Sequence, residues 1–211
     1  MMLPESLIVP PSIIRKMFTE THWETTDNSV LFTFDDGPYP KSTEIILHRL
    51  ASYGVHALFF VNGGGDRGAM KEIVQSGHTL GNHLFHHKRA FFLSREVIKD
   101  SIRRTNEVIE DISGSECRYF RPPYGIPFFG MGSMMKYFNM KTVMWSLLSW
   151  DFRYDVQTIN AIIKSYISAG KILVFHNNPL IETKIASALD YTHAHITEQN
   201  LIIGEPVECL M

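Results

Sequence analysis

Residues 33–38 read TFDDGP, an aspartate pair between an apolar run and a Gly-Pro turn. The apolar and aromatic residues before the pair predict a strand, and the turn predicts that the strand ends there. Adjacent carboxylates repel each other, so such a pair needs a cation or a proton. Because side chains alternate along a strand, Asp35 and Asp36 are expected to face differently, so that one could bind a metal while the other acts as a base. On local evidence alone, an ordinary Asp-Gly turn with a helix N-cap carboxylate also fits.

Short apolar or β-branched runs alternate with longer helical patterns along the rest of the chain. The expected strands are Ser29–Phe34, His56–Val61, His78–Asn82, Arg118–Arg121, Met140–Ser146, Lys171–His176 and Asn200–Ile203. The expected helices are Lys41–Tyr53, Arg95–Ile112, Val156–Ala169 with Gly170 as its C-cap, and Ile181–His193. This alternation indicates βαβ units and a parallel sheet, either an open doubly wound sheet or a barrel.

Composition narrows the class of protein. The chain has 211 residues, of which 45% are hydrophobic and 20% charged, as in globular proteins, and α/β barrels of this length often form one domain. The formal net charge of -2 argues against a nucleic-acid partner, which usually requires a basic surplus. Two cysteines, Cys117 and Cys209, are too few for a disulfide framework or a cysteine-ligated zinc site, so free thiols are expected.

The sequence predicts no membrane span, because no run approaches the roughly 18 apolar residues that a transmembrane helix needs. The first residues lack the basic region of a secretory signal peptide, and Pro10 and Pro11 interrupt the apolar stretch that follows. A cytoplasmic location is therefore expected, or an extracytoplasmic one if a leader was removed. The oligomeric state stays open.

Side chains suited to catalysis follow the expected strands. The aspartate pair follows the first strand and His83 the third, Arg121 ends the fourth, Asp151 comes shortly after the fifth, and His176 ends the sixth. Both fold types place functional residues at the carboxyl ends of parallel strands. These side chains are therefore expected to share one site.

The sequence His83-Leu84-Phe85-His86-His87 contains two histidines four residues apart. In a helical turn this spacing puts the rings of His83 and His87 on one side, where both can ligate one divalent ion. His86 would then point to the surface or stand behind the ligands. With an aspartate, the two histidines would form a triad that leaves open positions for water and substrate. A spacing this short also occurs by chance, so the pair alone is a weak signal.

Residues 121–125, RPPYG, predict a stiff loop. Two prolines fix φ and lack N–H groups, so the next free amide, that of Tyr124, is held in a defined direction. A rigid amide donor can serve an oxyanion hole, and Arg121 could keep a carboxylate ionised. A polyproline-like turn with a surface arginine is equally compatible with the local sequence.

Asp151 lies among apolar and aromatic residues, where a carboxylate needs a histidine or arginine partner. His176 ends a strand, and a histidine near an acid can act as a general acid. Taken alone, His176 fits a hydrogen-bonded structural histidine better.

Together these motifs resemble the polysaccharide deacetylase family, carbohydrate esterase family 4, whose members include chitin, chitooligosaccharide and peptidoglycan N-acetylglucosamine deacetylases. The resemblance covers roughly residues 29–203. Its five motifs occur in the family's order: TFDDGP at 33–38, His83 with His87, RPPYG at 121–125, Asp151, and Val174-Phe175-His176. The chain departs from the family's pattern at Leu84, Leu148, Phe152 and Asn177, which bear on substrate choice and rate.

The resemblance implies an α/β fold, a distorted (β/α)7 TIM-like barrel in a single catalytic domain over residues 29–211. Residues 1–28 are then an N-terminal extension packed on the barrel. The resemblance also implies one divalent metal ion, with zinc first and cobalt, nickel or manganese as alternatives, held by Asp36, His83 and His87.

The remaining roles follow from the same resemblance. Asp35 would be the catalytic base, Arg121 would orient Asp35, and the Tyr124 amide would help to stabilise the oxyanion. Asp151 would tune His176, which would protonate the leaving amine. The aromatic rings expected to stack on sugar are Tyr124, Trp150 and Phe152.

The activity implied is metal-dependent hydrolysis of N-acetyl groups from N-acetylglucosamine-containing polysaccharides or oligosaccharides, of chitooligosaccharide or peptidoglycan type. Two alternatives change the chemistry: an O-acetyl-carbohydrate esterase or amino-sugar deformylase on the same site, or a catalytically silent carbohydrate-binding protein. Retention of Asp35 and His176 counts against a silent binder, because binding needs neither a base nor an acid.

Overall fold

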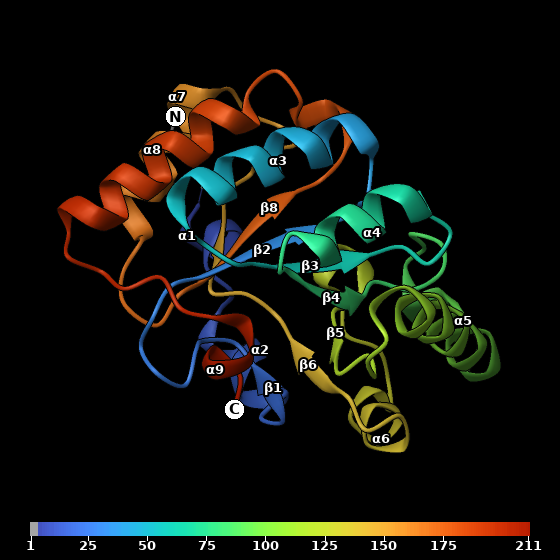
Figure 1. The fold of residues 1–211 in the computed structure, drawn as a ribbon. Coiled ribbons are helices and arrows are strands. Elements are labelled where there is room, and N and C mark those ends of the chain that lie inside the picture. The colour runs from blue at the N-terminus through green and yellow to red at the C-terminus, as the bar shows by residue number, and fades with distance from the viewer. Residues whose placement is uncertain (1–3) are drawn as a thin grey trace.

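The computed structural model describes residues 4–211 and contains one curved parallel sheet with helices around it (Figure 1). Its eight strands are β1 (Thr21–His22), β2 (Leu31–Asp35), β3 (Leu58–Val61), β4 (Thr79–Asn82), β5 (Tyr119–Phe120), β6 (Lys141–Val143), β7 (Leu147–Leu148) and β8 (Ile172–His176). Their order in the sheet is β1-β6-β5-β4-β3-β2-β8-β7. The expected distorted (β/α)7-type barrel is confirmed.

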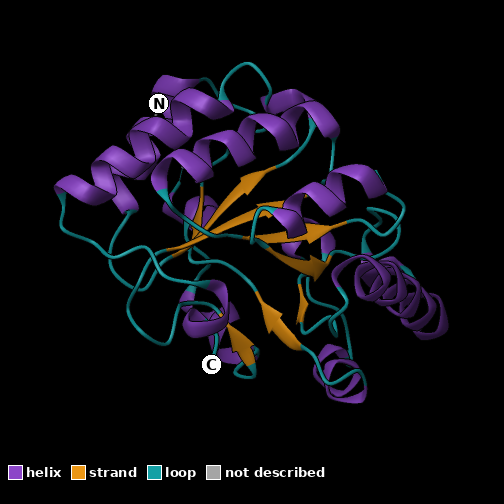
Figure 2. Cartoon of the chain, in the orientation of Figure 1, coloured by secondary structure: helices purple, strands orange, loops and turns teal. Residues whose placement is uncertain are grey.

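Helices lie on the outside of the sheet, as Figure 2 shows. The α-helices are α1 (Glu5–Ile8), α2 (Ser12–Met17), α3 (Pro40–Tyr53), α4 (Arg67–Gln75), α5 (Arg95–Ser113), α6 (Met131–Tyr137), α7 (Val156–Tyr166), α8 (Ile185–Glu198) and α9 (Pro206–Cys209). Three short 3-10 helices are η1 (Ala90–Phe92), η2 (Pro123–Gly125) and η3 (Pro179–Ile181). Helix α3 packs between α8 and α4 on one side of the sheet (Figure 1).

The central strands β2, β3 and β8 are almost completely buried, as expected for a parallel sheet covered by helices. Phe34 stacks between Phe59, with ring centroids 4.8 Å apart, and Phe175, at 6.1 Å. Because β2 pairs with both β3 and β8, this aromatic layer fixes the sheet next to Asp35 and His176, which stand side by side in the β2–β8 register.

Helix boundaries depend on local caps. Ser94 accepts a hydrogen bond from the amide of Val97 at the start of α5, and Gly114 ends that helix in the left-handed region, with φ of 67°. Asp155 caps α7 in the same way, through the amide of Thr158. Each cap satisfies a backbone group that the helix itself leaves unpaired.

Several sequence-based boundaries are wrong. The expected strand at residues 200–203 is reduced to one bridge between Val30 and Ile203, and the expected strand at 140–146 covers β6 only, with β7 following it as a separate strand. Helix α7 ends at Tyr166, because the backbone of Ile167 is extended. Gly170 is therefore not its C-cap. Helix α8 begins at Ile185 instead of 181, and α4 and α6 were not expected at all.

The N-terminal segment contributes to the sheet and to the core. Strand β1 pairs in parallel with β6, through Thr21 opposite Thr142. The side chain of Ile8 is buried in the main hydrophobic cluster, and α1 packs against β7. A division of the chain between residues 28 and 29 stays a prediction.

None of the helices within residues 4–211 combines the length and apolar character that crossing a membrane requires.

Candidate active site

A cavity of about 430 Å³ opens at the carboxyl ends of the strands. Asp35 ends β2, His176 ends β8, and His83 directly follows β4. All three line the cavity, together with Asp36, His87 and Tyr124. The volume lies within the usual range of small-molecule sites. Side chains distant in the sequence therefore meet in one place, as the parallel strand order predicts.

Asp36, His83 and His87 form a cluster suited to a metal ion. One possible ligand atom from each of these three side chains lies within 4.8 Å of the other two, and no other such group of His, Cys, Asp or Glu occurs within residues 4–211. Oδ1 of Asp36 is 3.0 Å from Nε2 of His87 and 3.7 Å from Nε2 of His83. One carboxylate oxygen and two imidazole nitrogens are common ligands of zinc and related divalent ions.

The tautomer of His83 is set by the backbone. Its Nδ1 lies 2.8 Å from the carbonyl oxygen of Arg121, and since a carbonyl can only accept, Nδ1 is the donor. In the neutral ring, Nε2 then has its lone pair free toward Asp36. Burial lowers the pKa of His83, and the nearby carboxylates of Asp35 and Asp36 offset this only in part, so the ring is held neutral.

His87 completes the cluster with an unsatisfied nitrogen. Its Nε2 lies 3.0 Å from Asp36 Oδ1 without a hydrogen bond between them, and this buried atom has no other hydrogen-bond partner among the described residues. A buried polar atom without a partner is unusual in a folded protein. Together with the free nitrogen of His83, it shows that these three residues fit one divalent ion.

The two histidines do not lie in a helical turn, so that expectation is wrong. Leu84 adopts the left-handed region, with φ of 66°, which interrupts any helix at this point. The loop is held instead by Asn82, whose Oδ1 accepts from the Leu84 amide, and by Ser101 of α5, whose hydroxyl accepts from the Phe85 amide. The Leu84 side chain is fully buried. His86 is exposed, as expected.

Asp36 lies just past the end of β2, with φ of 76°, so its carboxylate leaves the strand direction of Asp35. Burial raises the pKa of the Asp36 carboxyl, but the surrounding imidazoles, His87 first, outweigh burial and hold the pKa well below its usual range. Asn178 donates a hydrogen bond of 3.0 Å to its Oδ2, which orients the carboxylate. Asn178 was not expected at the site.

Asp35 is held by Arg121. The guanidinium Nη1 lies 2.7 Å from Asp35 Oδ1 and also donates to the hydroxyl of Thr33 at 2.8 Å. Nε and Nη2 donate to the carbonyl oxygens of Val143 and Met144, so the fully buried guanidinium is fixed on all sides. A charge-assisted hydrogen bond of this kind fixes the orientation of the Asp35 carboxylate. The surface-arginine alternative is excluded.

The loop of residues 121–125 places Tyr124 in the left-handed region, with φ of 60°. Pro122 and Pro123 lack N–H groups, so the next amide after them that can donate belongs to Tyr124. The Tyr124 ring lies against His87, with centroids 4.4 Å apart. At Gly125, which has φ of 61°, a Cβ would lie 1.7 Å from the Trp145 ring, so glycine is required there.

Asp151 and His176 form a buried pair. Asp151 Oδ1 lies 2.7 Å from His176 Nδ1, and Oδ2 accepts from the His176 backbone amide at 2.8 Å. Burial lowers the pKa of His176, but the charge and hydrogen bond of Asp151, with smaller contributions from Asp36 and Asp35, outweigh burial and raise it to about 9. Since Nδ1 faces Asp151, Nε2 is the nitrogen left to the cavity. The pairing expected from the sequence is present.

The aromatic side chains expected near substrate, Tyr124, Trp150 and Phe152, all line the cavity. Phe152 packs edge-on against His176, with centroids 4.6 Å apart. Asn177, at a position where the chain departs from the family's pattern, does not line the cavity. Its side-chain oxygen accepts a hydrogen bond from the Ser42 hydroxyl, and its side-chain nitrogen donates one to the Thr43 hydroxyl, at the start of α3. The cavity also contains side chains that the sequence analysis did not place there, namely Ser6, Leu7, Trp145, Asn178 and Leu180. No short motif marks these residues, because long-range packing brings them to the site.

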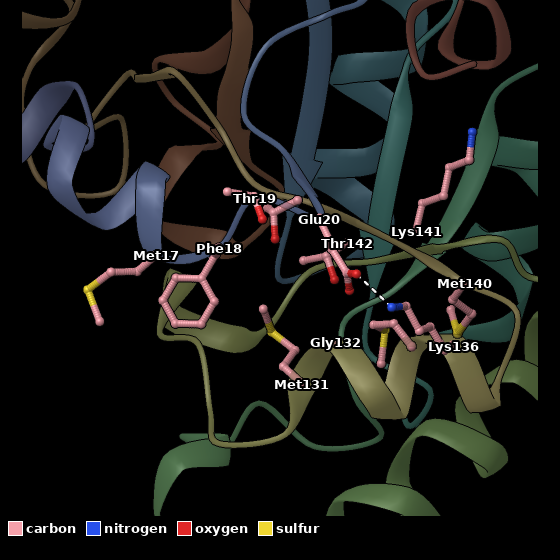
Figure 3. A pocket seen from close by; sticks show the side chains of 12 residues that line it. Met17, Phe18, Thr19, Glu20, Met131, Gly132, Lys136, Met140, Lys141 and Thr142 are labelled. Atoms are coloured by element: carbon pink, nitrogen blue, oxygen red, sulfur yellow. Dashed lines mark hydrogen bonds and ion pairs between the residues drawn. The ribbon is translucent and has the colours of Figure 1, made fainter.

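A second cavity, of about 400 Å³, lies between α2, β1 and α6 (Figure 3). Methionines line much of it, and an ion pair of 2.6 Å joins Lys136 to Glu20 (Figure 3). The residues that line it include no histidine or aspartate. The candidate catalytic side chains therefore belong to the first cavity.

Comparison with known proteins gives the family. The profile of the family described as polysaccharide deacetylase matches residues 22–143, more than half of the chain. This match spans the aspartate pair, both histidines and the RPPYG loop.

Two curated bacterial relatives and one solved structure are similar to the chain. A peptidoglycan-N-acetylglucosamine deacetylase of Bacillus cereus is 29% identical over 71% of this chain and 56% of its own length. The peptidoglycan-N-acetylmuramic acid deacetylase PdaC of Bacillus subtilis is 31% identical over 83% of this chain and 38% of its own length. The chain thus spans about half or less of these relatives. A crystal structure of a peptidoglycan N-acetylglucosamine deacetylase superimposes with a TM-score of 0.87 at 22% identity, over 92% of this chain and 95% of that one, which shows the shared fold.

Proposed function

The chain belongs to the polysaccharide deacetylase family, and we propose that it is a metal-dependent hydrolase that removes N-acetyl groups from amino sugars of a glycan. The relatives' names, which refer to peptidoglycan N-acetylglucosamine and N-acetylmuramic acid, support a peptidoglycan-type substrate, with chitooligosaccharides as the second candidate. One observation carries the proposal: the cluster of Asp36, His83 and His87 shares a cavity with His176, whose Nδ1 lies 2.7 Å from the buried Asp151 carboxylate.

Asp36, His83 and His87 would hold one divalent ion, zinc first, whose chemistry there is to polarise the acetamide carbonyl and to acidify water. The orphaned Nε2 of His87 and the fixed tautomer of His83 support this assignment. Cobalt, nickel and manganese accept the same nitrogen and oxygen ligands, so the donor set does not select among these ions.

Asp35 would act as the general base. Its carboxylate is held and oriented by the Arg121 guanidinium, and it would take a proton from the attacking water. The Tyr124 amide, in a loop stiffened by two prolines, would donate to the oxygen that becomes negative as the water adds.

His176 would act as the general acid. Its Nε2 faces the cavity, and Asp151 raises its pKa to about 9, so the ring carries a proton at neutral pH. That proton would pass to the sugar nitrogen as the C–N bond breaks. Water and the N-acetyl sugar then yield acetate and the free amine.

The proposal is tested by acetate release from zinc-loaded protein with N-acetylated glycan strands and N-acetylglucosamine oligomers, with Asp35→Asn as the matched control. The expected result is release that disappears in the control. Preferential release of acetate from O-acetylated xylan, or of formate from N-formyl amino sugars, would instead support the esterase or deformylase alternative. Binding of these sugars without turnover of any would support a silent carbohydrate-binding protein.

A further inference from the structure

Helix α1 reaches the catalytic cavity. Ser6 and Leu7 line it, although they lie far from all motif residues in the sequence. The next residue, Ile8, is only 2% exposed and anchors the helix in the main hydrophobic cluster, while α1 packs against β7. The cavity is therefore bounded on one side by the N-terminal segment.

A hydrogen bond joins α1 to Trp150. The indole Nε1 donates to the carbonyl oxygen of Leu7 over 2.9 Å. Trp150 itself adopts the left-handed region, with φ of 59°, which is uncommon for a bulky residue and needs support from its surroundings. The carbonyl of Leu7 and the rings of Phe152 and Tyr154, at 5.1 Å and 6.0 Å from the Trp150 ring, provide it.

Trp150 and Leu7 lie on the side of the cavity where His176 lies. Trp150 packs on Phe152, and Phe152 packs edge-on against the imidazole of His176. A sugar whose nitrogen receives a proton from His176 must therefore lie close to this side. Indole and aliphatic surfaces suit the apolar face of a pyranose ring, because both are removed from water in the contact.

We propose that α1 is a substrate-contacting wall of the active site, in which Leu7 and the Trp150 ring that it holds bind a sugar ring of the N-acetylglucosamine chain. This inference rests on the proposed function and extends it to a segment before the region that the family profile matches. The wall acts on binding: its loss weakens the hold on the sugar while the base, the acid and the ion ligands stay in place. KM is then expected to rise with little change in kcat.

Two substitutions separate the parts of the wall. Trp150→Phe keeps an aromatic ring but removes the indole N–H, and Leu7→Ala keeps the carbonyl acceptor but removes the apolar side chain. Loss of one hydrogen bond changes affinity roughly 2- to 10-fold, and loss of an aliphatic contact about 10-fold or more.

Matched controls exist in the same segment. Trp23→Phe also removes an indole N–H that donates to an N-terminal carbonyl, that of Phe18 at 3.2 Å, but Trp23 does not line the catalytic cavity. Ile13→Ala removes an exposed aliphatic side chain from α2, at a residue that is 69% exposed. Both are expected to leave binding and turnover within about twofold of the parent, since neither contacts the sugar.

The experiment measures two quantities with the N-acetylglucosamine tetramer as probe. Calorimetry in the Asp35→Asn background gives Kd, and acetate release by zinc-loaded protein with native Asp35 gives KM and kcat. The expected result is a Kd and KM raised at least about threefold in Trp150→Phe and Leu7→Ala, with unchanged kcat and unchanged controls. Equal Kd values in all four variants, or no binding by the parent, would overturn the inference. If the parent releases acetate but Trp150→Phe and Leu7→Ala have unchanged KM values, the wall is refuted and the proposed function stands. If these two variants bind the tetramer more weakly but no protein releases acetate, the proposed function is refuted and the wall stands.

Discussion

His83 donates its Nδ1 proton to the carbonyl oxygen of Arg121, while the guanidinium of the same Arg121 holds Asp35. One buried residue thus fixes the tautomer of a metal-ligand candidate through its main chain and the orientation of the base candidate through its side chain. The two halves of the site are coupled by geometry through this fully buried arginine, which directly follows β5.

Replacing His83 or His87 with alanine is expected to lower zinc affinity at least about 100-fold, because each removes one of three ligands. Zinc should raise the unfolding temperature of the native chain and raise it far less in either variant, since an ion stabilises only a state that binds it. His86→Ala is the matched control, because His86 is exposed and lies between them. An equal response of all three variants to zinc would mean that the ligand set is wrong.

Asp35→Asn is expected to reduce turnover about 10²–10⁴-fold while zinc affinity is retained, because an amide cannot accept the proton of water. Asp36→Asn, in contrast, should lower zinc affinity, because it removes the charged oxygen ligand. Metal content and acetate release measured on the same samples distinguish the two. Loss of the ion from Asp35→Asn, with retention in Asp36→Asn, would show that the two roles are exchanged.

Asp151→Asn is expected to lower kcat and to move the alkaline limb of the pH–rate profile to lower pH. A general acid works only while protonated, so activity falls as pH rises through the pKa of His176. Burial lowers that pKa, but the Asp151 carboxylate outweighs burial and raises it to about 9, so removing the charge brings it down. The measurement is kcat against pH for both proteins. An alkaline limb that stays in place would show that another group titrates.

The same pair predicts non-additivity. His176→Ala should cost at least as much turnover as Asp151→Asn, and the double variant little more than the worse single one, since the carboxylate acts through the histidine. Additive losses in kcat would give Asp151 a separate role.

Gly125→Ala is expected to destabilise the fold by about 3 kcal/mol, because a Cβ would meet the Trp145 ring in a backbone conformation unfavourable to alanine. Gly114→Ala is the matched control: its φ of 67° imposes the same conformational strain, but nothing lies within 4 Å of its Cβ. It should cost about 1–2 kcal/mol. Urea unfolding measures both, and equal losses would mean that the Trp145 contact contributes nothing.

The sequence was sufficient to predict the parallel sheet and the gathering of Asp35, Asp36, His83, Arg121 and His176 at one edge. Strand periodicity and motif position carry that information, because the carboxyl ends of parallel strands meet. The catalytic and metal-binding roles of these residues, the compartment and the oligomeric state stay predictions.

Other features depend on contacts between distant segments. Strand β1 has two residues and no apolar run, and Leu84 takes a left-handed conformation held by Asn82 and Ser101. Asn178 reaches Asp36 because the chain turns after β8, and Leu7 enters the cavity because Ile8 is anchored in the core. Local propensity does not encode such placements, so single-sequence reasoning missed them.

Acetate release by metal-stripped protein, followed by stepwise return of zinc, tests the central claim most directly. The account predicts no release from an N-acetylglucosamine oligomer by the stripped protein, and recovery that levels off at one zinc ion per chain. It also predicts no recovery in His83→Ala at the same zinc concentration. Full acetate release by thoroughly stripped protein, or equal recovery in His83→Ala, would contradict it.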